Sequence, residues 1–148
     1  DEFFAPGWGA GVAGLEGGPY DALMANDSRV LGDELRSDDQ SGAAAREIER
    51  RHGLKARVLD LRWLVPLHAA PIALHGAACA RIVVVDEGRR SAGVGEGVLT
   101  ALVEAGLGHK PIARVVGEDT YTPLAGAANL ILPQDADIVA AAEGLLRA

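Results

Sequence analysis

The chain has 148 residues, of which 49% are hydrophobic and 24% charged, and this size and composition are typical of one globular domain. The formal net charge of −7 argues against a protein that binds nucleic acid or an anionic membrane surface, because both need clustered Lys and Arg. Cys79 is the single cysteine, so an internal disulfide is impossible and a thiolate zinc site is not expected.

Residues 1–41 differ from the rest and are interpreted as a glycine-rich leader. Glycine makes ordering entropically unfavourable, so residues 1–20 are expected to be a loop. Residues 20–35 (YDALMANDSRVLGDEL) predict a short helix, a turn at 26–28 and a strand at 29–31. The start is acidic, unlike a secretory signal peptide, and no apolar run of about 18 residues occurs. We therefore expect a cytoplasmic protein.

From residue 42 onward the pattern alternates regularly between helix and strand. We expect helices at 42–52, 72–80, 95–106 and 135–146, and strands at 56–61, 81–86, 111–116 and 129–132. The run RIVVVD at 81–86 is continuously β-branched, which indicates a strand covered on both faces. This order predicts an α/β three-layer sandwich around a mostly parallel sheet.

In such sheets the functional loops follow the carboxyl ends of the strands. One of these loops lies in VVVDEGRRSAGVGEGV, where a glycine-rich stretch leads from strand to helix, as in phosphate-binding loops. The spacing Gly93-x-Gly95-x-Gly97 departs from Gly-x-Gly-x-x-Gly, and Glu96 would repel a phosphate. We favour a structural role in which the glycines let the helix begin close to the sheet, and anion binding with help from Arg89 and Arg90 stays open as an alternative.

Acid–base chemistry by Asp86 and Glu87 is a second candidate. Adjacent residues of a strand point to opposite faces, so we expect these carboxylates to form ion pairs with Arg89, Arg90 or Arg114 instead.

Metal binding and nucleophilic catalysis have little support in the sequence. The four histidines lack the His-x-x-x-His spacing of metal ligands, and Ser91 has no flanking nucleophile elbow. We therefore expect no catalytic, cofactor-binding or metal-binding residue, and the residues alone indicate an interaction or subunit module.

Three stretches in the predicted order carry a specific resemblance: AAAREIERRHGLKARVLDLRWLVPL, RIVVVDEGRRSAGVGEGVLTALVEAG and PIARVVGEDTYTPLAGAANLILPQDADIVAAA. Residues 42–148 resemble the C-terminal domain of the transketolase family. They are most similar to the beta-subunit side of thiamine-diphosphate-dependent 2-oxoacid dehydrogenases of the pyruvate or branched-chain type.

The resemblance implies subunit association, shaping of an active-site entrance and docking of the dihydrolipoyl acyltransferase core. It makes five residues candidates for an interface or for the rim of a site: Glu87, Arg89, Arg90, Glu118 and Asp119. It also implies a homo- or hetero-oligomer in which thiamine diphosphate and magnesium are bound only in the full complex. Gly32-Asp33 lacks the second glycine of the family's diphosphate motif, so we expect this chain alone to bind neither thiamine diphosphate nor magnesium.

Two further interpretations stay open. The chain could be an active subunit that completes a thiamine-diphosphate enzyme in trans, with oxidative decarboxylation of a 2-oxoacid and acyl transfer to a lipoyl arm, or a small-ligand sensor that uses residues 87–90.

The leader is also similar to the start of the family's pyrimidine-binding domain, as a remnant or a replacement of it. The first strand of the family's C-terminal domain is expected to be missing before GAAAREI, and whether residues 29–31 take its place is left open.

Overall fold

A computed structural model describes residues 20–26, 40–61 and 64–147. Its strands are β1 (Tyr20–Asn26), β2 (Ala56–Asp60), β3 (Cys79–Arg89) and β4 (Ile112–Gly117). Its α-helices are α1 (Gln40–His52), α2 (Ala69–Ala77), α3 (Val94–Glu104) and α4 (Asp135–Arg147), and a 3₁₀ helix η1 spans Ala125–Leu130. All the strand pairs are parallel, in the order β2–β1–β3–β4. The predicted fold class is confirmed.

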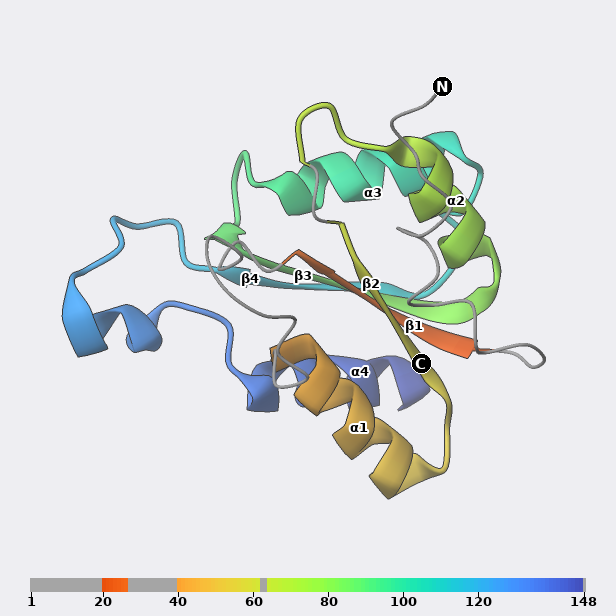
Figure 1. Ribbon diagram of the computed structural model, residues 1–148, viewed down its shortest axis with the longest axis horizontal. Helices are drawn as coiled ribbons and strands as arrows, with labels where there is room; N and C mark the ends of the chain where they lie inside the picture. Colours follow the sequence, from red (N-terminus) through yellow and green to blue (C-terminus); the bar gives the residue numbers. More distant parts are fainter. Residues whose placement is uncertain (1–19, 27–39, 62–63, 148) are drawn as a thin grey trace.

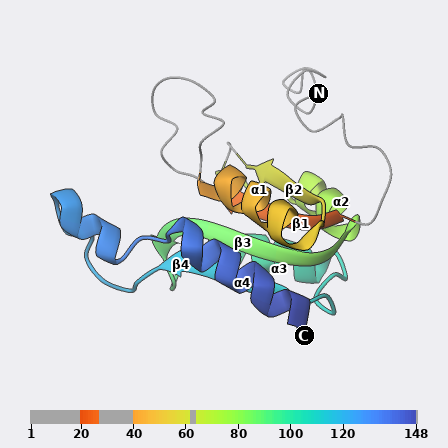
Figure 2. The same cartoon turned by 90° about the horizontal axis from the view of Figure 1, so that it is seen from below.

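The helices cover the sheet on both faces. Figure 1 shows α2 and α3 on one side and α1 and α4 on the other, and Figure 2 shows α1 and α4 side by side across the sheet. Each layer buries its own apolar core.

The central strand β3 divides these two cores by simple alternation. Val83 and Val85 pack with α1 and α4, whereas Ile82 and Val84 pack with α2 and α3. All four side chains are at most 4% exposed, as the continuous β-branched run predicts for a strand covered on both faces.

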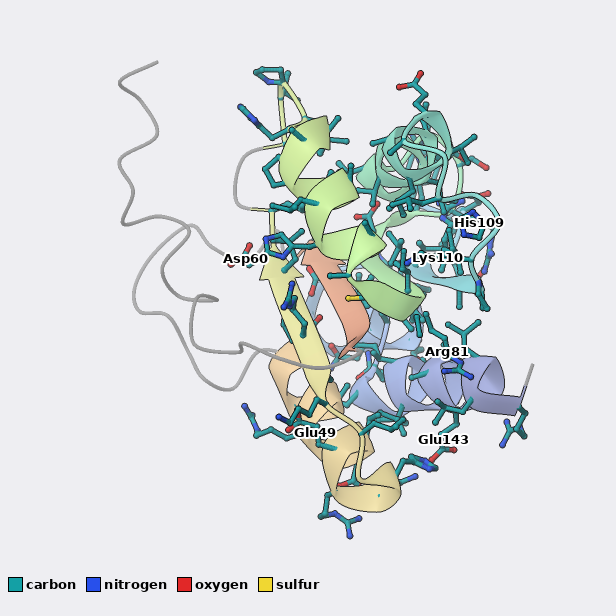
Figure 3. All side chains as sticks on the ribbon, turned by 90° about the vertical axis from the view of Figure 1, so that its right-hand side faces the viewer. Glu49, Asp60, Arg81, His109, Lys110 and Glu143 are labelled. Atoms are coloured by element: carbon teal, nitrogen blue, oxygen red, sulfur yellow. The ribbon has the colours of Figure 1, made fainter. Side chains whose placement is uncertain are left out.

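The C-terminal ends of the four described α-helices are capped, two by glycines and two by cationic side chains. Gly53 (φ 64°) and Gly106 (φ 78°) adopt the left-handed conformation that stops α1 and α3, as the sequence predicts. The Lys110 ammonium donates to the carbonyls of Gly76 (3.0 Å), Ala77 (2.9 Å) and Cys79 at the end of α2. Arg81 similarly donates to a carbonyl in the last turn of α4 at 2.7 Å (Figure 3).

The helix predicted at the start of residues 20–35 is wrong, because Tyr20–Asn26 forms β1. This strand lies between β2 and β3, so its backbone is hydrogen-bonded on both edges, and that pairing overrides the helix propensity of its Ala, Leu and Met residues. A strand, β1, does precede α1 in the chain, and whether it corresponds to the family's first strand stays a prediction. The turn and the strand predicted for residues 27–31 lie outside the described residues.

The strand predicted at 129–132 is also wrong. Residues up to Leu130 belong to η1, which projects from the body (Figures 1 and 2). The Ile131 carbonyl accepts from the N–H of Glu118 at 3.2 Å, just after β4, but residues 129–132 form no strand. The division of the chain at residue 42 stays a prediction, although the sheet does include residues from the leader.

Candidate functional site at the carboxyl edge of the sheet

The loop after β3 is organised around one buried carboxylate. Asp86 is 3% exposed, and its two oxygens accept hydrogen bonds from the backbone N–H groups of Gly88 and Gly95, both at 2.8 Å. Gly95 lies in the first turn of α3, so Asp86 ties the end of β3 to the start of that helix. The ion pair expected for Asp86 is therefore wrong: backbone amides, and not arginines, compensate its charge.

The glycines of this loop leave room for that carboxylate. A Cβ on Gly88 would lie 2.9 Å from an oxygen of Asp86, and a Cβ on Gly93 would lie 2.8 Å from one. Gly93 also passes so close to the Arg89 carbonyl that a Cβ would lie 2.5 Å from its oxygen. The favoured structural role of the glycines is thus supported by close packing on an internal anion.

A diphosphate does not fit this loop. The N-terminus of α3 already receives the Asp86 carboxylate, and Glu96 in the same turn accepts from the N–H of Ala92 at 3.0 Å. Two negative charges thus occupy the positions that a phosphate would need.

Arg114 on β4 supports the same loop from the neighbouring strand. Its Nη2 donates to the carbonyl of Arg90 at 2.8 Å, and its Nη1 lies 3.9 Å from the Glu96 carboxylate. The Arg114 side chain is only 18% exposed, so it acts from beneath the loop.

The five rim candidates lie at the carboxyl ends of two paired strands and in the loops that follow them. Glu87 and Arg89 lie at the end of β3, and Arg90 follows them. Glu118 and Asp119 directly follow β4, and Arg89 is in register with Gly117 of that strand. Glu87 is half-buried, whereas the other four are exposed. The structure therefore brings residues from both loops to one edge, and their role in an interface stays a prediction.

One direct link joins these two loops. The Asp119 carboxylate accepts from the N–H of Ser91 at 2.8 Å and from its hydroxyl at 2.7 Å. These bonds, together with the nearby charges of Arg90 and Arg89, lower the pKa of Asp119 below its usual value. The ionised Asp119 carboxylate therefore links the start of the segment that follows β4 to Ser91 in the loop after β3.

That segment, residues 118–134, is here called the arm. It projects from the body between β4 and α4 (Figures 1 and 2), and residues 120–134 include no charged side chain. Three large apolar side chains on it are almost completely exposed: Tyr121 (96%), Leu124 (91%) and Leu130 (84%). Large apolar side chains are seldom left this exposed on a protein surface, so the arm is an unusual feature of this domain.

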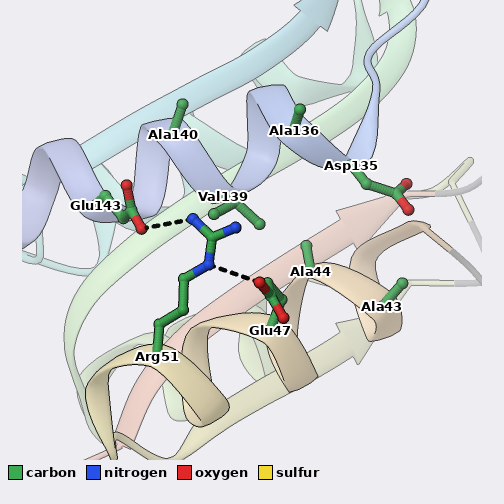
Figure 4. A pocket seen from close by; sticks show the side chains of 9 residues that line it. All are labelled: Ala43, Ala44, Glu47, Arg51, Asp135, Ala136, Val139, Ala140 and Glu143. Carbon is green, nitrogen blue, oxygen red and sulfur yellow. Dashed lines mark hydrogen bonds and ion pairs between the residues drawn. The ribbon is translucent and has the colours of Figure 1, made fainter.

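A groove of about 370 Å³ lies between α1 and α4. Figure 4 shows that much of its wall consists of alanines, with Val139 among them. The alanines are Ala43, Ala44, Ala136 and Ala140. Its charged side chains are Glu47, Arg51, Asp135 and Glu143.

Arg51 bridges the two helices at one side of this groove. It donates to Glu47 at 2.6 Å and to Glu143 at 3.1 Å. Hydrogen bonds from Arg50 and Arg51 lower the pKa of Glu47 to about 2. Hydrogen bonds from His52 and Arg51 also lower the pKa of Glu143. Both glutamates are therefore ionised at neutral pH, and the groove carries more carboxylates than cations.

Other candidate chemistry finds no support among the described residues. They include no cluster of three or more His, Cys, Asp or Glu that could hold a metal ion. His75 accepts from Arg57 at 3.0 Å, because a guanidinium only donates, and burial followed by the charge of Arg57 lowers the pKa of His75. No helix within the described ranges is long and apolar enough to cross a membrane.

The fold and this edge together define a three-layer α/β domain with an exposed apolar arm. Residues 39–138 match the family described as transketolase, C-terminal domain, and the chain belongs to that family.

Known proteins support this assignment. The chain is 37% identical over 109 residues to the pyruvate dehydrogenase E1 component subunit beta of Staphylococcus epidermidis, and equally to that of Staphylococcus aureus. The match covers 72% of this chain and 33% of each relative, so the chain spans about a third of their length. The fold is also similar to that of a solved structure titled "Split gene transketolase, inactive beta4 tetramer". The TM-score is 0.68 and the identity is 21%, over 88% of this chain and 39% of that one.

Sequence reasoning missed the internal role of Asp86, the arm and the α1–α4 groove. An uncharged run that contains Tyr121, Leu124 and Leu130 was a usable signal for the arm, because a solvated loop usually contains charges. The groove had no such signal, since it depends on how two helices distant in the sequence pack.

Proposed function

We propose that this chain is an assembly and partner-docking domain of a 2-oxoacid dehydrogenase first component and carries no cofactor site of its own. The observation that carries the proposal is the arm, which presents Tyr121, Leu124 and Leu130 to solvent. Exposed side chains of this size are typical anchors of protein–protein interfaces. Around its base, Glu87, Arg89, Arg90, Glu118 and Asp119 would form a charged rim.

The relatives support this proposal. They are named as beta subunits of a pyruvate dehydrogenase E1 component, and the solved structure is titled a tetramer of beta chains. The partners we propose are other dehydrogenase subunits and the dihydrolipoyl acyltransferase core. Thiamine diphosphate and magnesium would be bound by other domains of the full complex, because the loop after β3 is filled by Asp86.

A second candidate is an active subunit that completes the enzyme in trans. The 37% identity to a chain named as an E1 beta subunit favours it. In that case the rim residues at the carboxyl edge would border the site where a 2-oxoacid is decarboxylated, and other chains would supply the cofactor.

Co-purification tests the proposal directly. The tagged full chain is expressed with an E1 alpha subunit, and we expect the two to elute together. The Arg89→Ala/Arg90→Ala double variant should lose most of the bound partner, because it removes two rim cations, whereas Lys55→Ala, also exposed, should retain it. Equal recovery with both variants would exclude the rim from the interface, and no recovery with the unmodified chain would contradict docking.

Calorimetry separates the two candidates. The chain alone is titrated with thiamine diphosphate and magnesium, and we expect no saturable heat. Saturable binding would contradict a domain without a cofactor site and would favour the active subunit.

A further inference from the structure

The outer face of α2 has the composition of a buried surface. The helix, AAPIALHGA, contains no Asp, Glu, Lys or Arg, whereas each of the other three α-helices in the described ranges carries at least two such residues. Its solvent-facing residues are Ala69, Ala70, Leu74 and Ala77, and the Leu74 side chain is 69% exposed. A helix on the surface of a domain normally has a polar outer face, so α2 lacks a cover within the described residues.

This uncovered surface reaches the edge of the sheet where β3 and β4 begin. The Lys110 ammonium donates to the carbonyls of Gly76 and Ala77, so the end of α2 meets the segment that follows α3 (Figure 3). Val103, in the last turn of α3, is 60% exposed and adds a second large apolar side chain near this edge. A segment that covered α2 from this edge would therefore meet apolar surface at once.

Residues 1–19 join the described body at the same edge. They lead into β1, whose first residue, Tyr20, is in register with Cys79, two residues after the end of α2 at Ala77. The chain from Trp8 to Tyr20 can extend about 40 Å, whereas α2, with 9 residues, is about 14 Å long. The length and the point of attachment therefore suffice for residues 1–19 to run along the whole of α2.

The composition of residues 1–19 suits this face as well. They include both phenylalanines of the chain and one of its two tryptophans: Phe3, Phe4 and Trp8. Aromatic side chains bury more apolar area than any others, and the small alanines of α2 leave room for them beside Leu74. The segment therefore supplies what the outer face of α2 lacks.

We propose that residues 1–19 cover the outer face of α2 in the same chain, with Phe3, Phe4 and Trp8 as the anchoring side chains around Leu74. Because the segment is attached at Tyr20, it stays at a high local concentration beside α2 and needs no second molecule. The contact uses neither the arm nor the five rim residues, so it is independent of the proposed function.

Disulfide formation within one chain tests this contact. Gly9→Cys, next to Trp8, is combined in the full chain with Ala70→Cys on the outer face of α2, and the buried Cys79 does not compete for oxidation. The matched control combines Gly9→Cys with Ala140→Cys, an exposed alanine of α4 on the opposite face of the sheet (Figure 1).

On mild oxidation we expect the Ala70→Cys pair to cross-link about fivefold faster than the Ala140→Cys pair or more, at a rate that does not depend on protein concentration. Equal rates for the two pairs would overturn the proposal. A disulfide that joins two chains would also overturn it, because it would assign the face to a second copy.

Hydrogen exchange supplies a measurement that needs no introduced thiol. Phe3→Ser/Phe4→Ser/Trp8→Ser removes all three anchors, and amide exchange in α2 should become about threefold faster or more while exchange in α4 stays unchanged. The control Leu130→Ser removes an exposed leucine (84%) from the arm and should leave α2 unchanged. Unchanged exchange in α2 of the triple variant, or an equal acceleration in α2 and α4, would overturn the proposal.

Discussion

Replacing the buried carboxylate of Asp86 with an amide tests the central feature of the candidate site. In Asp86→Asn the shape is nearly unchanged, but one of the two acceptor oxygens becomes an NH₂ donor. That donor would face the N–H of Gly88 or Gly95, each of which now donates at 2.8 Å. The variant therefore isolates hydrogen bonding and charge from packing.

The size of the effect follows from burial. A hydrogen bond to a charged group contributes about 1.5–3 kcal/mol, and a buried donor left without an acceptor adds a desolvation penalty of about 1–3 kcal/mol. Asp86 is 3% exposed, so water cannot replace the lost acceptor. We expect Asp86→Asn to lower the free energy of unfolding by about 3 kcal/mol, which corresponds to a fall in Tm of roughly 6–12 °C.

Urea denaturation followed by circular dichroism measures this effect. The matched control is Asp137→Asn, where an exposed carboxylate also accepts from a backbone N–H, that of Gln134 at 2.9 Å. The amide oxygen of asparagine can still accept this bond, and the site is exposed, so the control should change stability by less than about 1 kcal/mol. Equal losses for the two variants would refute the argument that burial makes Asp86 special.

Substitution of the loop glycines tests whether the backbone packs closely against the Asp86 carboxylate. Gly93→Ala would place a Cβ 2.5 Å from the Arg89 carbonyl oxygen and should destabilise the fold by about 2–3 kcal/mol. Gly144→Ala on α4 meets nothing within 4 Å and should stabilise the fold by about 0.5–1 kcal/mol. A neutral Gly93→Ala would mean that the loop does not pack on Asp86 as described.

Two further predictions concern ion pairs and helix ends. Because the pKa of Glu47 is about 2 in the folded state and 4.5 is its ordinary value, its stabilising effect is fully present above pH 4.5 and is lost as the pH falls toward 2. Glu47→Gln should therefore have a lower free energy of unfolding than the unmodified chain near neutral pH, and the two plots of that free energy against pH should converge toward pH 2. The control Glu104→Gln, at an exposed position, should show no such convergence. If the plots for Glu47→Gln and the unmodified chain stay parallel, the lowered pKa of Glu47 is contradicted. Lys110→Met keeps the aliphatic stem but removes the ammonium at the end of α2, so urea unfolding should show a loss of about 2 kcal/mol. If exposed Lys55→Met costs as much, capping by Lys110 is not the cause.

The sheet and its covering helices were largely predictable, because periodicity reports burial. β3 shows this best: an uninterrupted β-branched run can only be satisfied by apolar neighbours on both faces, and Val83 and Val84 indeed face opposite cores. β1 was not predictable, since its sequence carries no strong strand pattern and its conformation depends on pairing with β2 and β3. Local propensity gives little information about a strand whose partners are distant in the sequence.

The glycine-rich loop shows why a correct pattern can suggest the wrong ligand. A strand, a loop with several glycines and a helix N-terminus together form a place where backbone N–H groups converge on a negative charge. The sequence predicts that place correctly but does not say which anion occupies it. Here the anion is the carboxylate of Asp86, two residues before Gly88 and nine before Gly95. With that place filled from within, the loop serves to hold Ser91 against Asp119 and so to position the arm.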